Sequence, residues 1–591
     1  MKKRVADIII ESLVEHGITD CFGVVGGGAM FLDNALALND NINKYFNHHE
    51  QASALAAEGY ARTSGRMAAV CVTSGPGVIN TLTGVQAAYV DSLPMIVLSG
   101  QVRYAISVEQ SGLPLRYRGV QEYQIVKSAE AMTKYAVMLK DPLSVKREMH
   151  KAIQIALEGR RGPVLLDVPQ DVQSAMVEED ELYPVEEYVV ERGEADYNKL
   201  VEALKNAKRP CLLTGTGIRN GGAHKEFMEF AEKLQIPVVG GYCAMDSMYL
   251  EHPLFFGQSG LIGPRTGNFI LQNADVILSL GNSLGFKQTG FYQEGFAPNA
   301  NIIMVEADEC ESRKPGLRVD QLIHRDLATF FKEVAQYDLP IGTNQEWMDY
   351  CVMLRNRFSP YEALEGLKKD ERVNSYHFWK LFAEHAKEDS ICSLGANSAN
   401  SAIVQIGVTK SQQRLLPNSN SGPMGCCLPY AIGGAVASGK EVYCVTGDGS
   451  VMMNLQELQT IRHYNLPVKV VIFSNDGYGT IRQTCKNFFN GKLLGCNAES
   501  GISFPNFGEV AKAFGFEYMH CRTNEELDTM LPELIAHPGH VLMEIDQLLD
   551  NPVSPKLMSR FENGKMQTPA LHDMAPFISK EELEELMQIS Q

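Results

Sequence analysis

Two short motifs in the C-terminal third of the chain contain the residue types that hold a metal-bound diphosphate. Asp448, Gly449 and Ser450 directly follow the apolar run EVYCVTG, and Asn475 follows the apolar run VKVVIFS. Asp and Asn supply the hard oxygen ligands that Mg²⁺ or Ca²⁺ prefers. Glycines let the backbone approach phosphate oxygens, and backbone amides and a serine hydroxyl can donate hydrogen bonds to an anion. The alternative is an ordinary Asx-type turn, which the 51 glycines of this chain favour.

The elements around these motifs are expected to bring the two ligands together. Both apolar runs are typical of buried strands that end in turn residues. Between them, residues 454–464 have helical spacing, so the unit is predicted as strand, loop, helix, strand. Parallel strands direct their carboxyl ends to one edge of a sheet, so Asp448 and Asn475 should lie side by side there.

Glu50 is a second candidate, far away in the sequence. It lies in the string HHEQ at the start of an alanine-rich helix that Gly65 ends. A carboxylate at this position is often only a favourable partner for the helix dipole, worth about 0.3–1 kcal/mol. Two strands then follow, AAVCV and MIVLS, and each runs into a turn rich in Gly, Ser or Pro.

Taken together, HHEQASALAAEGYARTSG, TSGPGVINTLTGV, LPMIVLSGQV and the GDGS motif with its Asn475 resemble the thiamine diphosphate enzymes, specifically the acetolactate synthase-like group. The resemblance covers nearly the whole chain, and the motifs come in the family's order. It implies an α/β fold of three doubly wound parallel-sheet domains. In chain order these are a pyrimidine-binding domain, a middle domain and a diphosphate-binding domain. The first and third domains should then share a fold.

The resemblance also implies roles for two residues near the reacting atoms. The Glu50 carboxylate would hydrogen-bond the aminopyrimidine ring of the cofactor and promote the imino tautomer, whose nitrogen takes the thiazolium proton. Gln121 matches a glutamine close to the reacting end of the cofactor. Gln121 and Lys134 could equally be solvated polar residues.

Further residues are assigned to the cofactor by the same resemblance. Gly422 matches the glycine whose backbone contacts the pyrimidine, and Met424 matches the apolar residue that bends the cofactor, although a Met is more often plain core. Asp448, Asn475 and the carbonyl of Gly477 would complete the Mg²⁺ shell. The remaining diphosphate contacts would come from Gly395, Ala396 and Asn397, where the family's usual Gln-His pair is absent.

Two departures from the family concern FAD and the acceptor. Acetolactate synthases commonly carry a non-redox FAD beside an Arg-Phe-Asp-Asp-Arg string, but residues 283–287 read SLGFK here, so FAD binding stays open. Val120 and Thr484 stand where the biosynthetic enzymes usually have Phe and Trp. Smaller side chains would enlarge the acceptor pocket.

These observations predict an enzyme that decarboxylates pyruvate or a similar 2-ketoacid and transfers the two-carbon unit to a carbonyl acceptor bulkier than pyruvate, such as a keto-sugar. A simple 2-ketoacid decarboxylase is one alternative. A non-catalytic regulatory or scaffold paralogue is another, although Glu50, Asp448 and Asn475 argue against it. The resemblance implies a homodimer or tetramer in which Glu50 of one subunit faces the diphosphate site of another.

Composition is consistent with this prediction. The net charge of −18 without a basic cluster argues against nucleic-acid and anionic-membrane surfaces, and no apolar run approaches the roughly 18 residues that span a bilayer. The 13 cysteines form no C-x-x-C pair, as expected for reduced thiols in the cytoplasm. The expected organisation is domains at 1–175, 195–336 and 373–550, a tail at 551–591, an acidic linker at 176–194 and an irregular stretch at 337–372.

Overall fold

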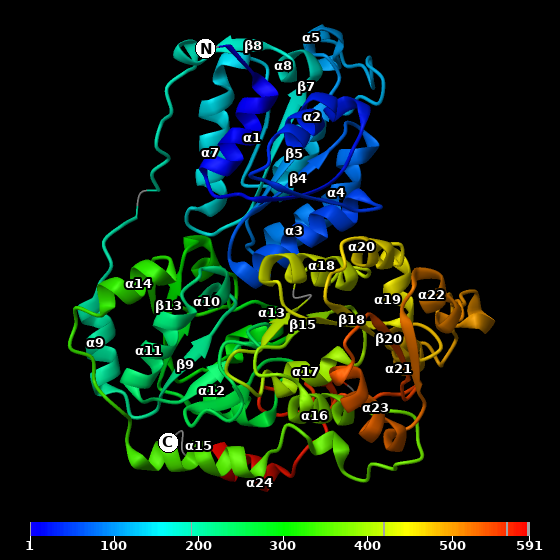
Figure 1. Cartoon of the computed structure of the whole chain (residues 1–591). Coiled ribbons are helices and arrows are strands. Elements are labelled where there is room, and N and C mark those ends of the chain that lie inside the picture. Colours follow the sequence, from blue (N-terminus) through cyan, green and yellow to red (C-terminus); the bar gives the residue numbers. More distant parts are fainter. Residues whose placement is uncertain (1, 191, 418–419, 563–564, 588–591) are drawn as a thin grey trace.

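The computed structural model describes residues 2–190, 192–417, 420–562 and 565–587. Three six-stranded parallel sheets succeed one another along the chain, each with helices on both faces (Figure 1). This confirms the predicted α/β fold. No helix in the described parts of the chain is long and apolar enough to cross a membrane.

The first sheet has strand order β3-β2-β4-β5-β7-β6. Helices α1 (Val5–Glu15) and α7 (Val145–Leu157) pack on one face, and α3 (Glu50–Ser64) and α4 (Pro76–Val90) on the other. In that order, the strands are β3 (Asn43–Phe46), β2 (Asp20–Val24), β4 (Ala68–Val72), β5 (Met95–Gln101), β7 (Pro163–Pro169) and β6 (Tyr135–Met138).

The third sheet repeats this topology, with order β16-β15-β17-β18-β20-β19. In both sheets the first strand of the unit lies between the second and the third, and the last two strands exchange places. The predicted common fold of the first and third units is therefore confirmed. In sheet order, the strands are β16 (Arg414–Leu416), β15 (Ile391–Leu394), β17 (Val442–Gly447), β18 (Val468–Ser474), β20 (Val541–Asp546) and β19 (Glu517–Cys521).

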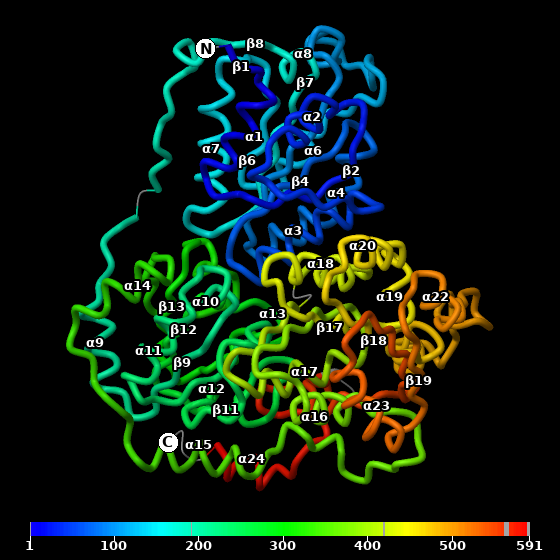
Figure 2. Tube along the Cα trace, in the orientation of Figure 1, coloured from blue at the N-terminus to red at the C-terminus, as the bar shows by residue number. Residues whose placement is uncertain are grey.

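The middle sheet has the order β11-β10-β9-β12-β13-β14, which is the order of a dinucleotide-binding fold. The short strand β8 (Met176–Glu178) is followed by a 3-10 turn at Glu179–Glu181 and by residues 182–190, which form no helix or strand (Figure 2). The middle unit begins with helix α9 (Tyr197–Asn206). In sheet order, the strands are β11 (Phe255–Gln258), β10 (Val238–Gly240), β9 (Pro210–Thr214), β12 (Val276–Leu280), β13 (Asn301–Glu306) and β14 (Gln321–His324).

The prediction of an irregular stretch at 337–372 is wrong in its centre. Residues Gln345–Arg357 form helix α15, which packs on the middle unit. Its buried residues Trp347, Tyr350, Cys351 and Leu354 follow the i, i+3, i+4, i+7 spacing of an amphipathic helix, so the signal was present in the sequence. The C-terminal tail also packs on the middle unit, where the buried Arg265 guanidinium donates to the Met574 carbonyl over 3.1 Å.

The first and third units meet where α3 lies against α18 (Cys427–Ser438), as Figure 1 shows. Two glycines let these helices approach closely. A Cβ on Gly59 would lie 2.6 Å from the Tyr430 Cα atom, and one on Gly433 would overlap the Ala56 carbonyl oxygen. One hydrophobic core cluster passes through this contact and joins both sheets, so the two units are firmly docked within one chain.

Candidate active site

Asp448 lies at the predicted edge of the third sheet and joins the ends of two adjacent strands. It begins the short helix α19 (Asp448–Val451) directly after β17, and its Oδ2 atom accepts hydrogen bonds from the backbone N–H groups of Asn475 and Gly477, both over 3.1 Å. Burial raises the pKa of Asp448 to about 6, although three backbone N–H donors oppose the shift. A cation beside this carboxylate would favour its charged form.

Asn475 presents an oxygen that has no protein partner. Its Nδ2 atom donates to Gln547 Oε1 over 3.1 Å and to Ser398 Oγ over 3.4 Å. Its Oδ1 atom is buried, and no hydrogen-bond partner for it occurs among the described residues. A buried acceptor that lacks a donor is costly, and a hard metal ion beside Asp448 would satisfy it. The residues here therefore fit a bound Mg²⁺.

The backbone conformation and the lack of space at position 477 both require glycine. Its φ angle is +136°, and an added Cβ would overlap the carbonyl oxygen of Cys496. The Gly477 carbonyl lies in the loop whose N–H groups donate to the Asp448 carboxylate. This position is consistent with its predicted place in a metal shell.

The other predicted diphosphate residues follow β15. Gly395, Ala396 and Asn397 line a cavity of about 180 Å³ together with Gly422, so the structure brings these segments together. The side chain of Asn397 accepts a hydrogen bond from the Asn400 backbone over 2.8 Å, which leaves mainly backbone groups for a ligand. Lys287 also lines this cavity, and sequence reasoning did not single it out as a site residue.

The loop with Gly422 and Met424 is tied to the GDGS motif. Gly422 has a φ of +67°, a region that favours glycine. The backbone N–H of Gly425 donates to Ser450 Oγ over 3.0 Å, so Ser450 supports this loop while its own hydroxyl hydrogen remains able to donate. Met424 is half-buried. Gly449 packs under Tyr478, because an added Cβ would overlap that ring.

Glu50 is the first residue of α3, as predicted, and its carboxylate is held by a neighbouring helix. Asn80 Nδ2 donates to Glu50 Oε2 over 2.9 Å. The adjacent Gln51 accepts from Asn454 Nδ2 over 3.0 Å, and the same nitrogen donates to the Gly425 carbonyl over 2.9 Å. Asn454 therefore links the start of α3 to the Gly422–Gly425 segment of the same chain, and the predicted pairing between subunits stays a prediction.

Gln121 lies at the same edge of the first sheet as Glu50. Its backbone is left-handed, with a φ of +56°, and Gly75 makes room for it, because a Cβ there would overlap the Gln121 carbonyl oxygen. The side chains of Val120 and Gln121 are exposed. Lys134 lies elsewhere, where its Nζ donates to the Glu158 carbonyl, and burial lowers its pKa to about 8.

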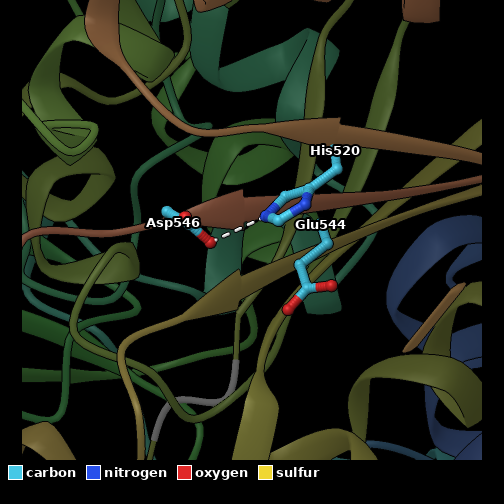
Figure 3. A group of neighbouring side chains, drawn as sticks. All are labelled: His520, Glu544 and Asp546. Carbon is cyan, nitrogen blue, oxygen red and sulfur yellow. Dashed lines mark hydrogen bonds and ion pairs between the residues drawn. The ribbon is translucent and has the colours of Figure 1, made fainter. Parts of the chain in front are cut away.

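A separate cluster on the third sheet also has ligand-type side chains. His520 on β19 and Glu544 and Asp546 on β20 have ligand atoms within 4.8 Å of one another (Figure 3). His520 Nε2 lies 2.9 Å from Asp546 Oδ1, and the Tyr518 hydroxyl donates to Glu544 Oε2 over 2.6 Å. These contacts are those of an ordinary polar cluster on a sheet, and we assign no ion to it.

Comparison with known proteins supports the site. Three family models match: the N-terminal TPP binding domain of thiamine pyrophosphate enzymes over residues 3–124, the central domain over 197–334 and the C-terminal TPP binding domain over 397–545. The chain belongs to the thiamine pyrophosphate enzyme family. Thiamine pyrophosphate is thiamine diphosphate, so the predicted cofactor and enzyme class are confirmed.

Relatives of this thiamine pyrophosphate enzyme match along most of their length. The chain is 28% identical over 586 residues to an acetolactate synthase of Arthrospira platensis, covering 95% of this chain and 98% of the relative. It is 27% identical over 542 residues to the acetolactate synthase isozyme 2 large subunit of Escherichia coli (strain K12), covering 91% and 95%. It is 30% identical over 557 residues to a probable acetolactate synthase large subunit of Methanococcus aeolicus, covering 90% of each. The predicted acetolactate synthase-like group is therefore confirmed.

Proposed function

We propose that this enzyme binds thiamine diphosphate through Mg²⁺, decarboxylates pyruvate or a similar 2-ketoacid, and transfers the remaining two-carbon unit to a carbonyl acceptor. The buried Asn475 Oδ1 atom beside Asp448 carries the metal part of the proposal, because it needs a partner that the described protein residues do not supply. The similarity to acetolactate synthases supports the carboligase part.

In this proposal Asp448, Asn475 and the carbonyl of Gly477 hold the ion, and backbone groups of residues 395–397 and 449 contact the diphosphate. Gly422 and Met424 position the pyrimidine. When bound, thiamine diphosphate supplies the electron sink that 2-ketoacid decarboxylation requires.

Glu50 is the proposed acid–base residue. Because Asn80 holds its Oε2 atom, the carboxylate is oriented before any ligand arrives. Preorganisation of this kind places the carboxylate where it can exchange a proton with a bound aminopyrimidine. Gln121 is proposed to contact the substrate.

The acceptor is proposed to be larger than pyruvate, such as a keto-sugar. Val120 is 83% exposed, and the Thr484 hydroxyl in α21 (Gly479–Phe488) turns back to the Thr480 carbonyl of its own helix. Both side chains are smaller than the aromatic rings usual at these positions, and both are exposed. Release of an aldehyde without ligation is the alternative outcome.

FAD remains an open part of the proposal. A cavity of about 380 Å³ between the first and middle units is lined by Arg160, Arg161, Arg325 and Thr216. Its lining also includes Arg192 and four acidic residues, Asp91, Glu158, Glu306 and Asp326, so its charge does not by itself favour a dinucleotide. The SLGFK string likewise argues against FAD. The absorbance of the purified protein in the flavin bands, followed by extraction of any bound cofactor, would show whether FAD is present.

The proposal also includes assembly as a homodimer or tetramer and a cytoplasmic location, which the free cysteines favour. Two small molecules, the 2-ketoacid and the carbonyl acceptor, are the expected partners.

An NMR time course with isotopically labelled pyruvate, Mg²⁺ and thiamine diphosphate tests the reaction. Acetolactate or acetoin would establish pyruvate as donor and ligation as the outcome, and adding keto-sugars would then test the larger acceptor. Acetaldehyde alone would indicate simple decarboxylation. Efficient acetolactate formation with no use of larger acceptors would overturn the keto-sugar part. Cofactor binding without turnover of any 2-ketoacid would support the non-catalytic alternative.

A further inference from the structure

The two residues that precede Gly422 are held by a different unit of the protein. The backbone N–H and the Nδ2 atom of Asn420 both donate to Asp91 Oδ1, over 3.2 and 2.6 Å. The Ser421 hydroxyl donates to Gln86 Oε1 over 2.5 Å. Gln86 lies in α4 of the first unit, and Asp91 caps the end of that helix. The start of the pyrimidine loop therefore depends on the first unit for its position.

Asp91 is itself fixed by a buried ion cluster. Its Oδ2 atom pairs with the Arg62 guanidinium, which also binds Glu58 Oε1 over 2.7 Å. The Tyr430 hydroxyl of the third unit donates to the same Glu58 oxygen over 2.7 Å. The side chains of Arg62, Glu58 and Asp91 are at most 5% exposed, so their directions are fixed by packing as well as by charge. Arg62 thus leaves Asp91 Oδ1 directed to Asn420.

The other end of the loop has anchors of a different kind. Gly425 is held by Ser450 and Asn454, both in the third unit. The hydrogen-bond partners of the Asp448 and Asn475 side chains also belong to the third unit: Gly477 N–H donates to Asp448, and Asn475 donates to Gln547. The diphosphate end of the site is thus built within one unit, and the pyrimidine end is built across two.

We propose that Asp91, oriented by Arg62, is a positioning residue that holds Asn420 and so sets the Gly422–Gly425 turn to receive the aminopyrimidine. The inference rests on the proposed use of thiamine diphosphate. Docking of the first unit on the third and occupancy of the pyrimidine site then strengthen each other, because each favours the same loop conformation. The inference applies equally if the docked units belong to different subunits.

A comparison of two ligands separates this positioning role from a general destabilisation of the whole cofactor site. Isothermal titration with thiamine diphosphate plus Mg²⁺ reports on both ends of the site, whereas inorganic pyrophosphate plus Mg²⁺ reports on the diphosphate end alone. Asn420 is exposed, so Asn420→Ala removes its side-chain bond to Asp91 without creating a cavity. Asn420→Asp adds repulsion from Asp91, and Asn41→Ala, at an exposed residue of the first unit, is the matched control.

For Asn420→Ala we expect the thiamine diphosphate Kd to rise about five- to tenfold, as for the loss of one hydrogen bond to a carboxylate. Asn420→Asp should raise it at least as much. The pyrophosphate Kd should change less than twofold in both variants, and Asn41→Ala should match wild type for both ligands. An unchanged thiamine diphosphate Kd in Asn420→Ala and Asn420→Asp would overturn the inference, and so would an equal loss for both ligands. A wild-type protein that binds no thiamine diphosphate would overturn the proposed function as well.

Discussion

The Asn475 Nδ2 atom donates a hydrogen bond to Gln547 Oε1 over 3.1 Å, and this bond fixes the orientation of the Asn475 amide. With Nδ2 engaged, Oδ1 is the atom left buried without a partner among the described residues. Asp448 lies beside it and accepts the Asn475 backbone N–H. The pair therefore combines a carboxylate with a preoriented amide oxygen, which is the donor set that a hard divalent cation prefers.

Replacing the carboxylate should weaken cofactor binding itself. We expect Asp448→Ala to lower the affinity for Mg²⁺ with thiamine diphosphate by at least about 100-fold, because it removes a charged ligand and the acceptor of three backbone N–H groups. Titration calorimetry measures this directly. Asp370→Ala, at an exposed carboxylate outside the metal loop, serves as the control.

Glu50→Gln should separate catalysis from binding. The amide keeps a hydrogen bond to the Asn80 side chain but cannot exchange a proton, so kcat should fall by about 100- to 10,000-fold. The affinity for Mg²⁺ and diphosphate should change little. Equal losses of cofactor affinity in Glu50→Gln and Asp448→Ala would show that our division of roles is wrong.

Gly477→Ala should disrupt the metal loop for a steric reason. The new Cβ would overlap the Cys496 carbonyl oxygen, so the loop must move and the Gly477 carbonyl moves with it. Gly501→Ala is a matched control, since Gly501 also has a positive φ but open space around it. We expect Gly501→Ala to retain cofactor affinity and to cost only about 1 kcal/mol of backbone strain. Similar Mg²⁺ affinities in the two variants would contradict this explanation.

Asp167 should make stability depend on pH. Burial raises its pKa to about 7, while hydrogen bonds from Gln101 and Ser99 oppose the shift. Because the folded pKa lies above the unfolded value, the contribution of Asp167 to stability is fully present below the unfolded pKa and is lost as pH rises through about 7. Asp167→Asn removes this dependence. Denaturant titrations at pH 5 and pH 8 measure the free energy of unfolding. Relative to wild type, the variant should be more stable at pH 8 than at pH 5, and a pH-independent difference would contradict the assignment.

Restoring aromatic side chains should narrow the acceptor range. In the double variant Val120→Phe and Thr484→Trp we expect the ratio of larger keto-acceptor products to acetolactate to fall by about tenfold or more, since a hydrophobic pocket discriminates by about 1–3 kcal/mol per methylene. Product ratios from a mixed-acceptor reaction, read by NMR, measure the change. A ratio unaffected by either substitution would show that these positions do not line the acceptor pocket.

Much of the site could be predicted from local sequence. The apolar runs before Asp448 and Asn475 specify buried strands, and the glycines after them specify turns, so both residues had to lie at the carboxyl edge of one sheet. Glu50 at a helix start and the shared topology of the first and third units are also confirmed. Helix α15 was not predicted, because its four buried apolar residues are separated by polar and charged residues.

The sequence by itself determined the family, the three-sheet architecture and the residue types at the cofactor site, because these depend on hydrophobic periodicity and turn residues that act over a few positions. Only the tertiary structure decided that Asn475 Oδ1 has no partner and that Asp91 holds Asn420, a residue 329 positions away. Contacts of this kind depend on how α3, α4 and α18 pack, and the angles and distances of that packing are not written in any local pattern.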